Sequence, residues 1–292
     1  MSTTLTRPSS TASEADVAST GSKLTRVLGI ASLVGLAVLL LLAFVFTEPD
    51  QRVFDRGLDL DPLLTGQGDA VRLLYVHFPV AMVTYTAFSL NAIGSIAVLW
   101  KKSMWWDNTA AAAAEVGVLF CGLTLATGSI WGRPIWNTWW KWGDVRLMTT
   151  TILFLIFVGY LAYRRTMTDS QVRAKRSAVV GLIGAINIPI VYKSVDWWQN
   201  RTLHQQSTLR DRAIEDLTLF SMIFGMVVFL VIFAWLMVHR FRIGWLEHQI
   251  ETVGLEAAIA ERRAQTSAAV EDAVTDSRAS AGSGPPPKTG MN

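Results

Sequence analysis

The stretch VLGIASLVGLAVLLLLAFVFT, residues 27–47, carries no ionisable side chain. A helix that crosses the hydrocarbon core of a bilayer needs about 17–25 apolar residues, and this run has the required length. It is also too long for the apolar core of a secretory signal peptide, and no small-residue cleavage site follows it. We therefore predict that these residues form an uncleaved first transmembrane helix.

Five more uncharged runs follow along the chain. Four have the length of a spanning helix, and the fifth, Ser177–Tyr192, is marginal unless the Lys193 ammonium reaches the membrane interface. We predict an all-α integral membrane protein with six transmembrane helices. The expected spans cover residues 27–47, 75–100, 109–130, 147–163, 177–195 and 217–239.

The composition agrees with a polytopic membrane protein and argues against a soluble enzyme. Of the 292 residues, 51% are hydrophobic and only 17% are charged, whereas soluble domains carry roughly 25% charged residues. The single cysteine, Cys121, excludes an internal disulfide and any cysteine-based zinc or iron–sulfur site. A net charge of +3 is too small a surplus to indicate binding to nucleic acid.

The distribution of Lys and Arg predicts the orientation in the membrane. With the N terminus inside, the cytoplasmic segments hold 16 basic residues and the outer segments hold 10, so the positive-inside rule places both termini in the cytoplasm. Around a six-helix membrane domain, residues 25–240, we expect a disordered leader over residues 1–24, a possible cytoplasmic helix over residues 241–264 and a disordered tail over residues 265–292.

The segment IWGRPIWNTWWKWGDVRL, residues 130–147, holds five tryptophans at the outer end of the third predicted helix. Tryptophan belts are common at membrane interfaces because the indole is apolar and has one polar N–H, and for Trp197 and Trp198 a belt and a functional role stay equally open. A belt needs only one or two tryptophans at each helix end. The higher density here favours an aromatic platform for a large, flat, apolar ligand, made of Trp131, Trp136, Trp139, Trp140 and Trp142.

Two of the four histidines face the same compartment as these tryptophans. His77 lies in VRLLYVHFPVAM at the mouth of the second helix, which we expect to begin just after it because Pro79 is tolerated only in a first turn or at a kink. His204 lies in VDWWQNRTLHQQST, after the fifth helix. A lone histidine at a helix mouth is more typical of a hydrogen-bonded cap, but two that flank an aromatic platform indicate axial ligands for haem iron.

Charged residues near this platform have two interpretations each. Four arginines are candidate partners for haem propionates, although they are also ordinary outer-loop charges. Asp144 either orients a nearby indole or histidine, or caps the fourth helix. Glu115 lies inside the third span, where an acid is a candidate functional residue, but its position near the cytoplasmic end favours an interfacial role. The four arginines are Arg72, Arg133, Arg146 and Arg201.

The pattern WG-x6-WW-x-W, from Trp131 to Trp142, resembles the tryptophan-rich signature of the WWD superfamily, whose members handle haem in cytochrome c maturation. The segments RLLYVHFPVAM and INIPIVYKSVDWWQNRTLHQQST are similar to one branch, the CcmC family, and the resemblance covers residues 70–210. In that family an aspartate directly follows the last tryptophan. Here Gly143 precedes Asp144, and we expect this glycine to absorb the insertion through a positive φ.

The resemblance implies a multi-pass protein of the bacterial cytoplasmic (inner) membrane that binds haem b on the outer face and loads it onto a CcmE-type haem chaperone. It also implies that the protein acts together with the CcmA and CcmB subunits of an ATP-binding cassette transporter and with CcmD. His77 and His204 fall on the axial-ligand positions, and we expect no catalytic residue. The candidate cofactor-binding residues are His77, His204, Trp131, Trp136, Trp139, Trp140, Trp142, Asp144, Arg146 and Arg72.

Two alternatives remain open. A haem lyase of the same superfamily is similar at the WWD segment, but such relatives are generally larger and carry histidines within their spans, whereas no histidine lies deep in a predicted span here. A haem-free permease or assembly subunit would use its tryptophans only as interfacial anchors and would show no Soret absorbance. The chain has no GxxxxGK[ST] phosphate-binding loop, so we expect haem binding and transfer rather than enzymatic ATP hydrolysis.

Overall fold

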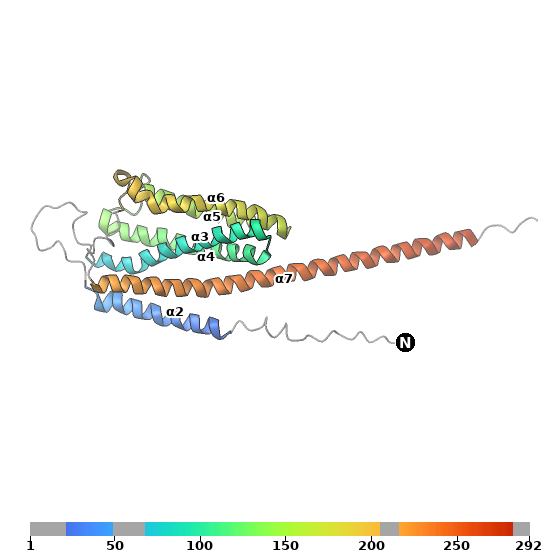
Figure 1. The fold of residues 1–292 in the computed structure, drawn as a ribbon, viewed down its shortest axis with the longest axis horizontal. Coiled ribbons are helices and arrows are strands. Elements are labelled where there is room, and N and C mark those ends of the chain that lie inside the picture. The colour runs from blue at the N-terminus through green and yellow to red at the C-terminus, as the bar shows by residue number, and fades with distance from the viewer. Residues whose placement is uncertain (1–21, 49–67, 205–215, 283–292) are drawn as a thin grey trace, which may run out of the picture. The chain divides into compact units, whose positions relative to one another are not determined.

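The computed structural model describes residues 22–48, 68–204 and 216–282, and the regular elements within those ranges are helices (Figure 1). The chain divides into two units, residues 1–242 and residues 243–292. The elements in order are α2 (Lys23–Leu41), the π-helical turn η1 (Leu42–Phe46), the 3₁₀ turn η2 (Asp69–Leu73), α3 (Leu74–Lys101), α4 (Met104–Trp136), α5 (Val145–Arg165), α6 (Ser170–Trp197), the 3₁₀ turn η3 (Gln199–Arg201) and α7 (Asp216–Gly282).

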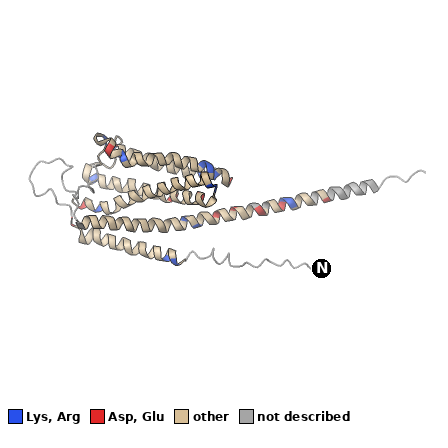
Figure 2. Cartoon of the chain, viewed as in Figure 1, with Lys and Arg blue, Asp and Glu red and all other residues tan. Residues whose placement is uncertain are grey.

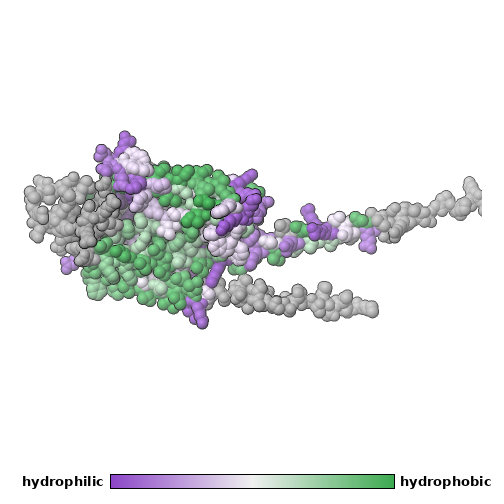
Figure 3. Space-filling view, viewed as in Figure 1, coloured by the Kyte–Doolittle hydropathy of each residue, from purple (hydrophilic) through white to green (hydrophobic). Residues whose placement is uncertain are grey.

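Six helical segments are long and apolar enough to cross a membrane, which confirms the predicted number of spans. In the first unit, charged residues gather toward the two ends of the helices (Figure 2), and hydrophobic residues form the band between them (Figure 3). A lipid bilayer imposes this distribution because its core solvates neither charges nor free backbone groups. The segments are Lys23–Phe46, Asp69–Lys101, Met104–Trp136, Val145–Arg165, Ser170–Trp197 and, within α7, Leu217–Ser267.

The helices α3 and α4 pack closely together because small residues lie between them. A β-carbon on Gly94 would lie 3.0 Å from the β-carbon of Ala110, and one on Gly117 would collide with the Phe88 ring. Phe88 in turn stacks on Phe157 of α5, with ring centroids 3.8 Å apart. Small residues at such contacts are typical of membrane helices, whose association depends on van der Waals packing rather than on exclusion of water.

The helix α2 packs against the first part of α7. The backbone at Gly29 lies under the indole of Trp235, where a β-carbon would be 3.3 Å from the indole nitrogen. Leu39 of α2 and Phe229 of α7 belong to one buried apolar cluster that also contains Tyr75 of α3. This shared cluster joins the α2–α7 pair to the other helices of the first unit.

Two ion pairs join helices near the N-terminal end of α4. Arg164 of α5 donates two hydrogen bonds, of 2.6 and 2.8 Å, to the buried carboxylate of Asp107. Glu115 accepts a hydrogen bond of 2.5 Å from Arg240 of α7. Both acids of α4 therefore have an arginine partner, which is how an ionised carboxylate is tolerated at membrane depth.

The two outermost spans in the sequence have neighbouring ends. Ser22, the N-cap of α2, accepts a hydrogen bond of 2.9 Å from Arg242 of α7. An even number of crossings brings the start of the first span and the end of the last to the same side of the membrane. The assignment of that side to the cytoplasm stays a prediction.

The start of α3 differs from the sequence prediction. The helix begins at Leu74, directly after η2, so His77 lies in its first turn rather than at its cap, and Pro79 lies inside the helix. Pro79 therefore lies in the second turn of α3, where its missing N–H leaves the Tyr75 carbonyl without its usual helical donor.

The end of α7 also differs. The helix continues to Gly282, whereas a disordered tail was expected over residues 265–292. The many alanines of this stretch, together with Glu and Arg, are strong helix formers, and their propensity outweighs the serines and glycines that suggested a tail. Residues 283–292 of the expected tail, and residues 1–21 of the expected leader, lie outside the described residues.

Candidate functional site

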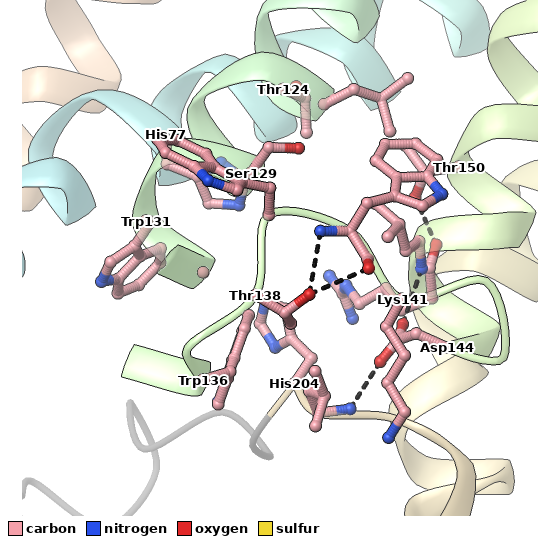
Figure 4. Close-up of a pocket in the computed structure, with 18 of the residues that line it drawn as sticks. His77, Thr124, Ser129, Trp131, Trp136, Thr138, Lys141, Asp144, Thr150 and His204 are labelled. Atoms are coloured by element: carbon pink, nitrogen blue, oxygen red, sulfur yellow. Dashed lines mark hydrogen bonds between the residues drawn. The ribbon is translucent and has the colours of Figure 1, made fainter. Parts of the chain in front are cut away.

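A cavity opens where α3 begins and α4 ends (Figure 4). Its volume is about 90 Å³, below the roughly 300–1,000 Å³ of typical small-molecule pockets. Its walls come from α3, the second half of α4, the α4–α5 loop, the first turns of α5 and the segment after η3. Eight of the ten predicted site residues line it: His77, His204, Trp131, Trp136, Trp139, Trp140, Asp144 and Arg146.

His77 projects from the first turn of α3 against α4. Its imidazole lies edge-on to the Trp131 ring, with centroids 5.4 Å apart, and its Nδ1 lies 3.0 Å from Thr127 Oγ1. The third neighbour is the backbone of Gly128, where a β-carbon would lie 3.0 Å from His77 Cε1. A short stretch of α4, residues 127–131, therefore sets the orientation of the ring.

His204 lies on the segment that follows η3. Its ring centroid is 6.2 Å from that of Trp136, and its backbone N–H donates a hydrogen bond of 3.1 Å to Thr202 Oγ1. Figure 4 shows His77 near Trp131 and His204 near Trp136. The fold thus brings two histidines that are far apart in the sequence to one cavity.

Asp144 holds two parts of the site together. One carboxylate oxygen accepts a hydrogen bond of 2.8 Å from the Leu147 N–H, which makes Asp144 the N-cap of α5. The other oxygen accepts a hydrogen bond of 2.5 Å from the Leu203 N–H, one residue before His204. The helix-cap role expected for this buried carboxylate is confirmed, and the orientation of a nearby indole or histidine stays a prediction.

The five tryptophans of the predicted platform have different environments. Trp142 does not line the cavity: it is 79% exposed and meets Trp140 edge-on, with ring centroids 5.7 Å apart. Trp139 lines the cavity with a side chain that is 58% exposed. The Thr138 hydroxyl fixes the backbone of Trp140, since it donates to the Trp140 carbonyl at 3.0 Å and accepts from its N–H at 3.3 Å. Among the described residues, the buried Nε1 of Trp140 has no hydrogen-bond partner.

Gly143 lies in a turn that a hydrogen bond of 3.0 Å closes, from the Asp144 N–H to the Lys141 carbonyl. The expected positive φ is not found at Gly143; in the described ranges Gly68 is the glycine that has one. A β-carbon on Gly143 would meet no atom within 4 Å. The residue inserted into the WWD pattern is therefore accommodated by an ordinary turn and not by the conformational freedom of glycine.

Arg72 does not line this cavity, and its predicted role in haem binding stays a prediction. Its guanidinium donates hydrogen bonds of 2.9 Å to the Ala43 and Phe44 carbonyls of η1 and one of 3.1 Å to Asp69. It borders a second hollow between α2, η1, η2 and α3. The carbonyls at the end of a helix lack intrahelical partners and attract a nearby guanidinium, which explains this position.

Among the other outer cations, Arg146 lines the cavity from the first turn of α5. Arg133 pairs with Asn137 at the end of α4, and Arg201 is exposed in η3. Of the described residues that line the cavity, Lys141 supplies the second cationic side chain. The cavity therefore offers two positive charges, one of which was predicted.

Sequence reasoning missed three residues of the site, and two of them left a signal. Thr127 lies one helical turn before Trp131 and so shares its helix face. Lys141 lies inside the tryptophan segment itself. Gly128 left no signal, because the absence of a side chain gains meaning only once the position of His77 is known.

Comparisons with known proteins agree with this architecture. The family model of heme exporter protein C (CcmC) matches residues 9–256. Heme exporter protein C of Bradyrhizobium diazoefficiens is 41% identical over 143 residues, which are 49% of this chain and 53% of that protein. The Escherichia coli K12 protein of the same name is 34% identical over 188 residues, 64% of this chain and 75% of that protein.

A third relative, heme exporter protein C of Haemophilus influenzae, is 33% identical over 209 residues, 69% of this chain and 82% of that protein. The chain thus spans about half the length of the Bradyrhizobium relative and larger shares of the other two. The family model covers well over half of this chain and includes every residue that lines the cavity. The protein belongs to the heme exporter protein C family.

Proposed function

We propose that this protein binds haem between His77 and His204 at the outer face of the bacterial cytoplasmic membrane and passes it to a CcmE-type haem chaperone. Its family supports a haem-handling role in cytochrome c maturation, and its six apolar helices support a multi-pass location in the inner membrane. The observation that carries the proposal is the convergence of two histidines on one cavity lined by tryptophans.

The lining residues fit haem as the transported substrate. Imidazole is a good axial ligand for iron, and the engaged Nδ1 of His77 leaves Nε2 for that role. The indoles of Trp136 and Trp140 offer an apolar surface for the porphyrin, and the buried Trp140 Nε1 is a donor that a bound ligand would satisfy. Arg146 and Lys141 supply one positive charge for each propionate.

Transfer requires a site that holds haem without trapping it. Trp139 and Trp142 expose 58% and 79% of their surface at this end of the bundle, so an approaching partner meets aromatic surface beside the cavity. His77 lies on a helix, whereas His204 lies on an irregular segment after η3. We expect His204 to leave the iron first, because an irregular segment rearranges at lower cost than a packed helix.

The same family assignment supports further components. In our proposal the chain works beside the CcmA and CcmB subunits of an ATP-binding cassette transporter and beside CcmD, and the transported haem is haem b. The absence of a GxxxxGK[ST] loop in the sequence means that ATP hydrolysis would be the work of a partner subunit. The part of this chain is then to bind haem and release it.

An absorption spectrum of the full chain tests the proposal. Protein purified in detergent from cells that express the chaperone should show a Soret band of low-spin, six-coordinate haem. The His77→Ala/His204→Ala variant should lose this band or shift it to high spin, because both axial ligands are gone. His239→Ala is the matched control, since His239 lies in α7 against Trp235, with ring centroids 5.3 Å apart.

Haem on the co-expressed chaperone is the second measurement. We expect a loaded chaperone with the wild-type chain and an empty one with the double variant. A folded wild-type chain that never carries haem would overturn the proposal and favour a haem-free permease or assembly subunit. Covalent attachment of haem to a CxxCH peptide by this chain alone would favour the haem lyase instead.

A further inference from the structure

We infer that Thr127 fixes the tautomer of His77, so that the ring presents an unprotonated Nε2 to the iron. This inference rests on the proposed function, in which His77 is an axial ligand. It assigns a positioning role to Thr127, which is not a proposed haem ligand and is not one of the described residues that line the cavity. The tautomer depends on which neighbour accepts the single hydroxyl proton of Thr127.

The hydroxyl of Thr127 has one proton to donate and two lone pairs. Its oxygen lies 2.7 Å from the Leu123 carbonyl, one turn earlier in α4, and 3.3 Å from the Thr124 carbonyl. A carbonyl oxygen can only accept, so Thr127 donates its proton within its own helix. It therefore has only a lone pair to offer to any other neighbour.

That other neighbour is Nδ1 of His77, 3.0 Å from the hydroxyl oxygen. Because the hydroxyl accepts in this contact, Nδ1 carries the ring proton. A neutral imidazole has one N–H, so Nε2 keeps its lone pair and is free to bind a metal. A hydrogen bond at the far nitrogen also orients the ring and makes the ligating nitrogen more basic.

Two further residues of α4 keep the ring in this orientation. A β-carbon at Gly128 would lie 3.0 Å from Cε1, 3.6 Å from Nδ1 and 3.9 Å from Nε2 of His77, so the ring packs directly against this backbone position. The Trp131 ring meets the imidazole at an angle of 63°. A rotation that exchanged the two ring nitrogens would give up the bond to Thr127, and this contact therefore selects one orientation.

The test compares two substitutions of Thr127 in the full chain, purified with haem. Thr127→Val keeps the shape of the side chain but removes the acceptor, and Thr127→Ser keeps the acceptor. We expect Thr127→Val to weaken haem binding about 10–100-fold, as does the loss of an outer-shell partner at other metal-bound histidines. The midpoint potential of the iron should become more positive, since a less basic imidazole stabilises ferric iron less. Thr127→Ser should resemble the wild type in both measurements.

Thr86→Val is the matched control. Thr86 makes the same bond within its helix, 2.9 Å to the Met82 carbonyl, but its side chain is exposed on α3. Its replacement should change neither the affinity for haem nor the potential.

The wild-type spectrum separates this inference from the proposed function. A wild-type chain without low-spin haem would overturn the proposed function, whatever the variants do. Low-spin haem in the wild type, with unchanged affinity and potential in Thr127→Val, would overturn the role of Thr127 alone.

If Thr127→Val loses its low-spin haem, added imidazole should restore the spectrum, because only the ligand is missing. No recovery, with equal damage from Thr127→Ser, would show a need for threonine in packing and overturn the inference.

Discussion

At the scale of single residues, Asp144 shows how the WWD segment and the second histidine depend on each other. Its two carboxylate oxygens bind the backbone N–H groups of Leu147 and Leu203, which lie on different elements. Hydrogen bonds to an ionised acceptor are stronger than neutral ones, and this one is buried. The carboxylate therefore holds the segment before His204 at the start of α5.

Replacement of Asp144 by alanine should have two effects. Loss of the N-cap should lower stability by about 1 kcal/mol, and release of Leu203 should free His204, so that the haem spectrum shifts toward high spin. Asp144→Asn has one acceptor oxygen and should retain one of the two bonds, with an intermediate spectrum. The midpoint of thermal unfolding and the Soret band, measured on the same sample, check both effects.

Asp169 provides the control for this experiment. It caps α6 through a hydrogen bond of 2.8 Å from the Val172 N–H and lies on the loop between α5 and α6. Asp169→Ala should lose comparable stability and keep the low-spin spectrum. If the spectrum of Asp144→Ala is equally unaffected, the carboxylate is a helix cap only.

At the scale of elements, α4 contributes to two different parts of the molecule. Its C-terminal half carries Thr127, Gly128 and Trp131 at the cavity. Its N-terminal half carries Asp107, which Arg164 of α5 binds through two hydrogen bonds. The ion pair thus stabilises the helix that supports the site without belonging to the site.

Removal of one partner of this ion pair should lower the stability of the protein more than removal of both partners. Asp107→Ala leaves Arg164, whose side chain is 13% exposed, without its counter-ion, and loss of one partner of a buried pair costs about 3–5 kcal/mol. The double variant Asp107→Ala/Arg164→Ala should regain part of that loss. Thermal unfolding of all four proteins in one detergent gives the coupling energy, and strictly additive losses would refute the coupling.

Substitutions of Arg72 and Arg146 should have opposite effects on stability and on haem binding, because Arg72 joins η2 to η1 and Arg146 lines the cavity. Arg72→Leu removes the hydrogen bonds to the Ala43 and Phe44 carbonyls, so thermal stability should fall while the affinity for haem stays unchanged. Arg146→Leu should weaken haem binding several-fold with little change in stability. Haem titration and thermal unfolding of both variants measure the difference. Equal loss of haem affinity in the two would support the predicted role of Arg72 in haem binding.

The spans were predictable from sequence because an uncharged run of sufficient length has few alternatives to a membrane helix. Both histidines and Asp144 were predictable from their motifs. The position of Arg72 was not predictable, because its place five residues before His77 in the sequence does not show that its guanidinium binds the carbonyls of η1. The helix face of Thr127 was predictable from its spacing to Trp131, but its contact with His77 required the packing of α3 on α4, which no local pattern specifies.

At the scale of the whole membrane domain, the two ends of the first unit differ in chemistry. One end holds the aromatic cavity with His77 and His204. The other holds the pairs Arg164–Asp107 and Arg240–Glu115. The positive-inside rule assigns the second end to the cytoplasm, because the loops there carry more Lys and Arg. Delivery of haem to an outer chaperone requires this orientation, so topology is a direct test of the function.

Labelling of introduced cysteines with a membrane-impermeant maleimide measures the orientation. The native Cys121 is buried and should contribute little background. Gly143→Cys places a thiol at the cavity end, where a β-carbon meets no atom within 4 Å, and Thr168→Cys places one on the exposed loop between α5 and α6. In cells whose outer membrane alone has been permeabilised, Gly143→Cys should react with the maleimide. Thr168→Cys should react only after the cytoplasmic membrane is opened as well. The reverse pattern would put the cavity in the cytoplasm, and a handoff of haem on the outer face would then be impossible.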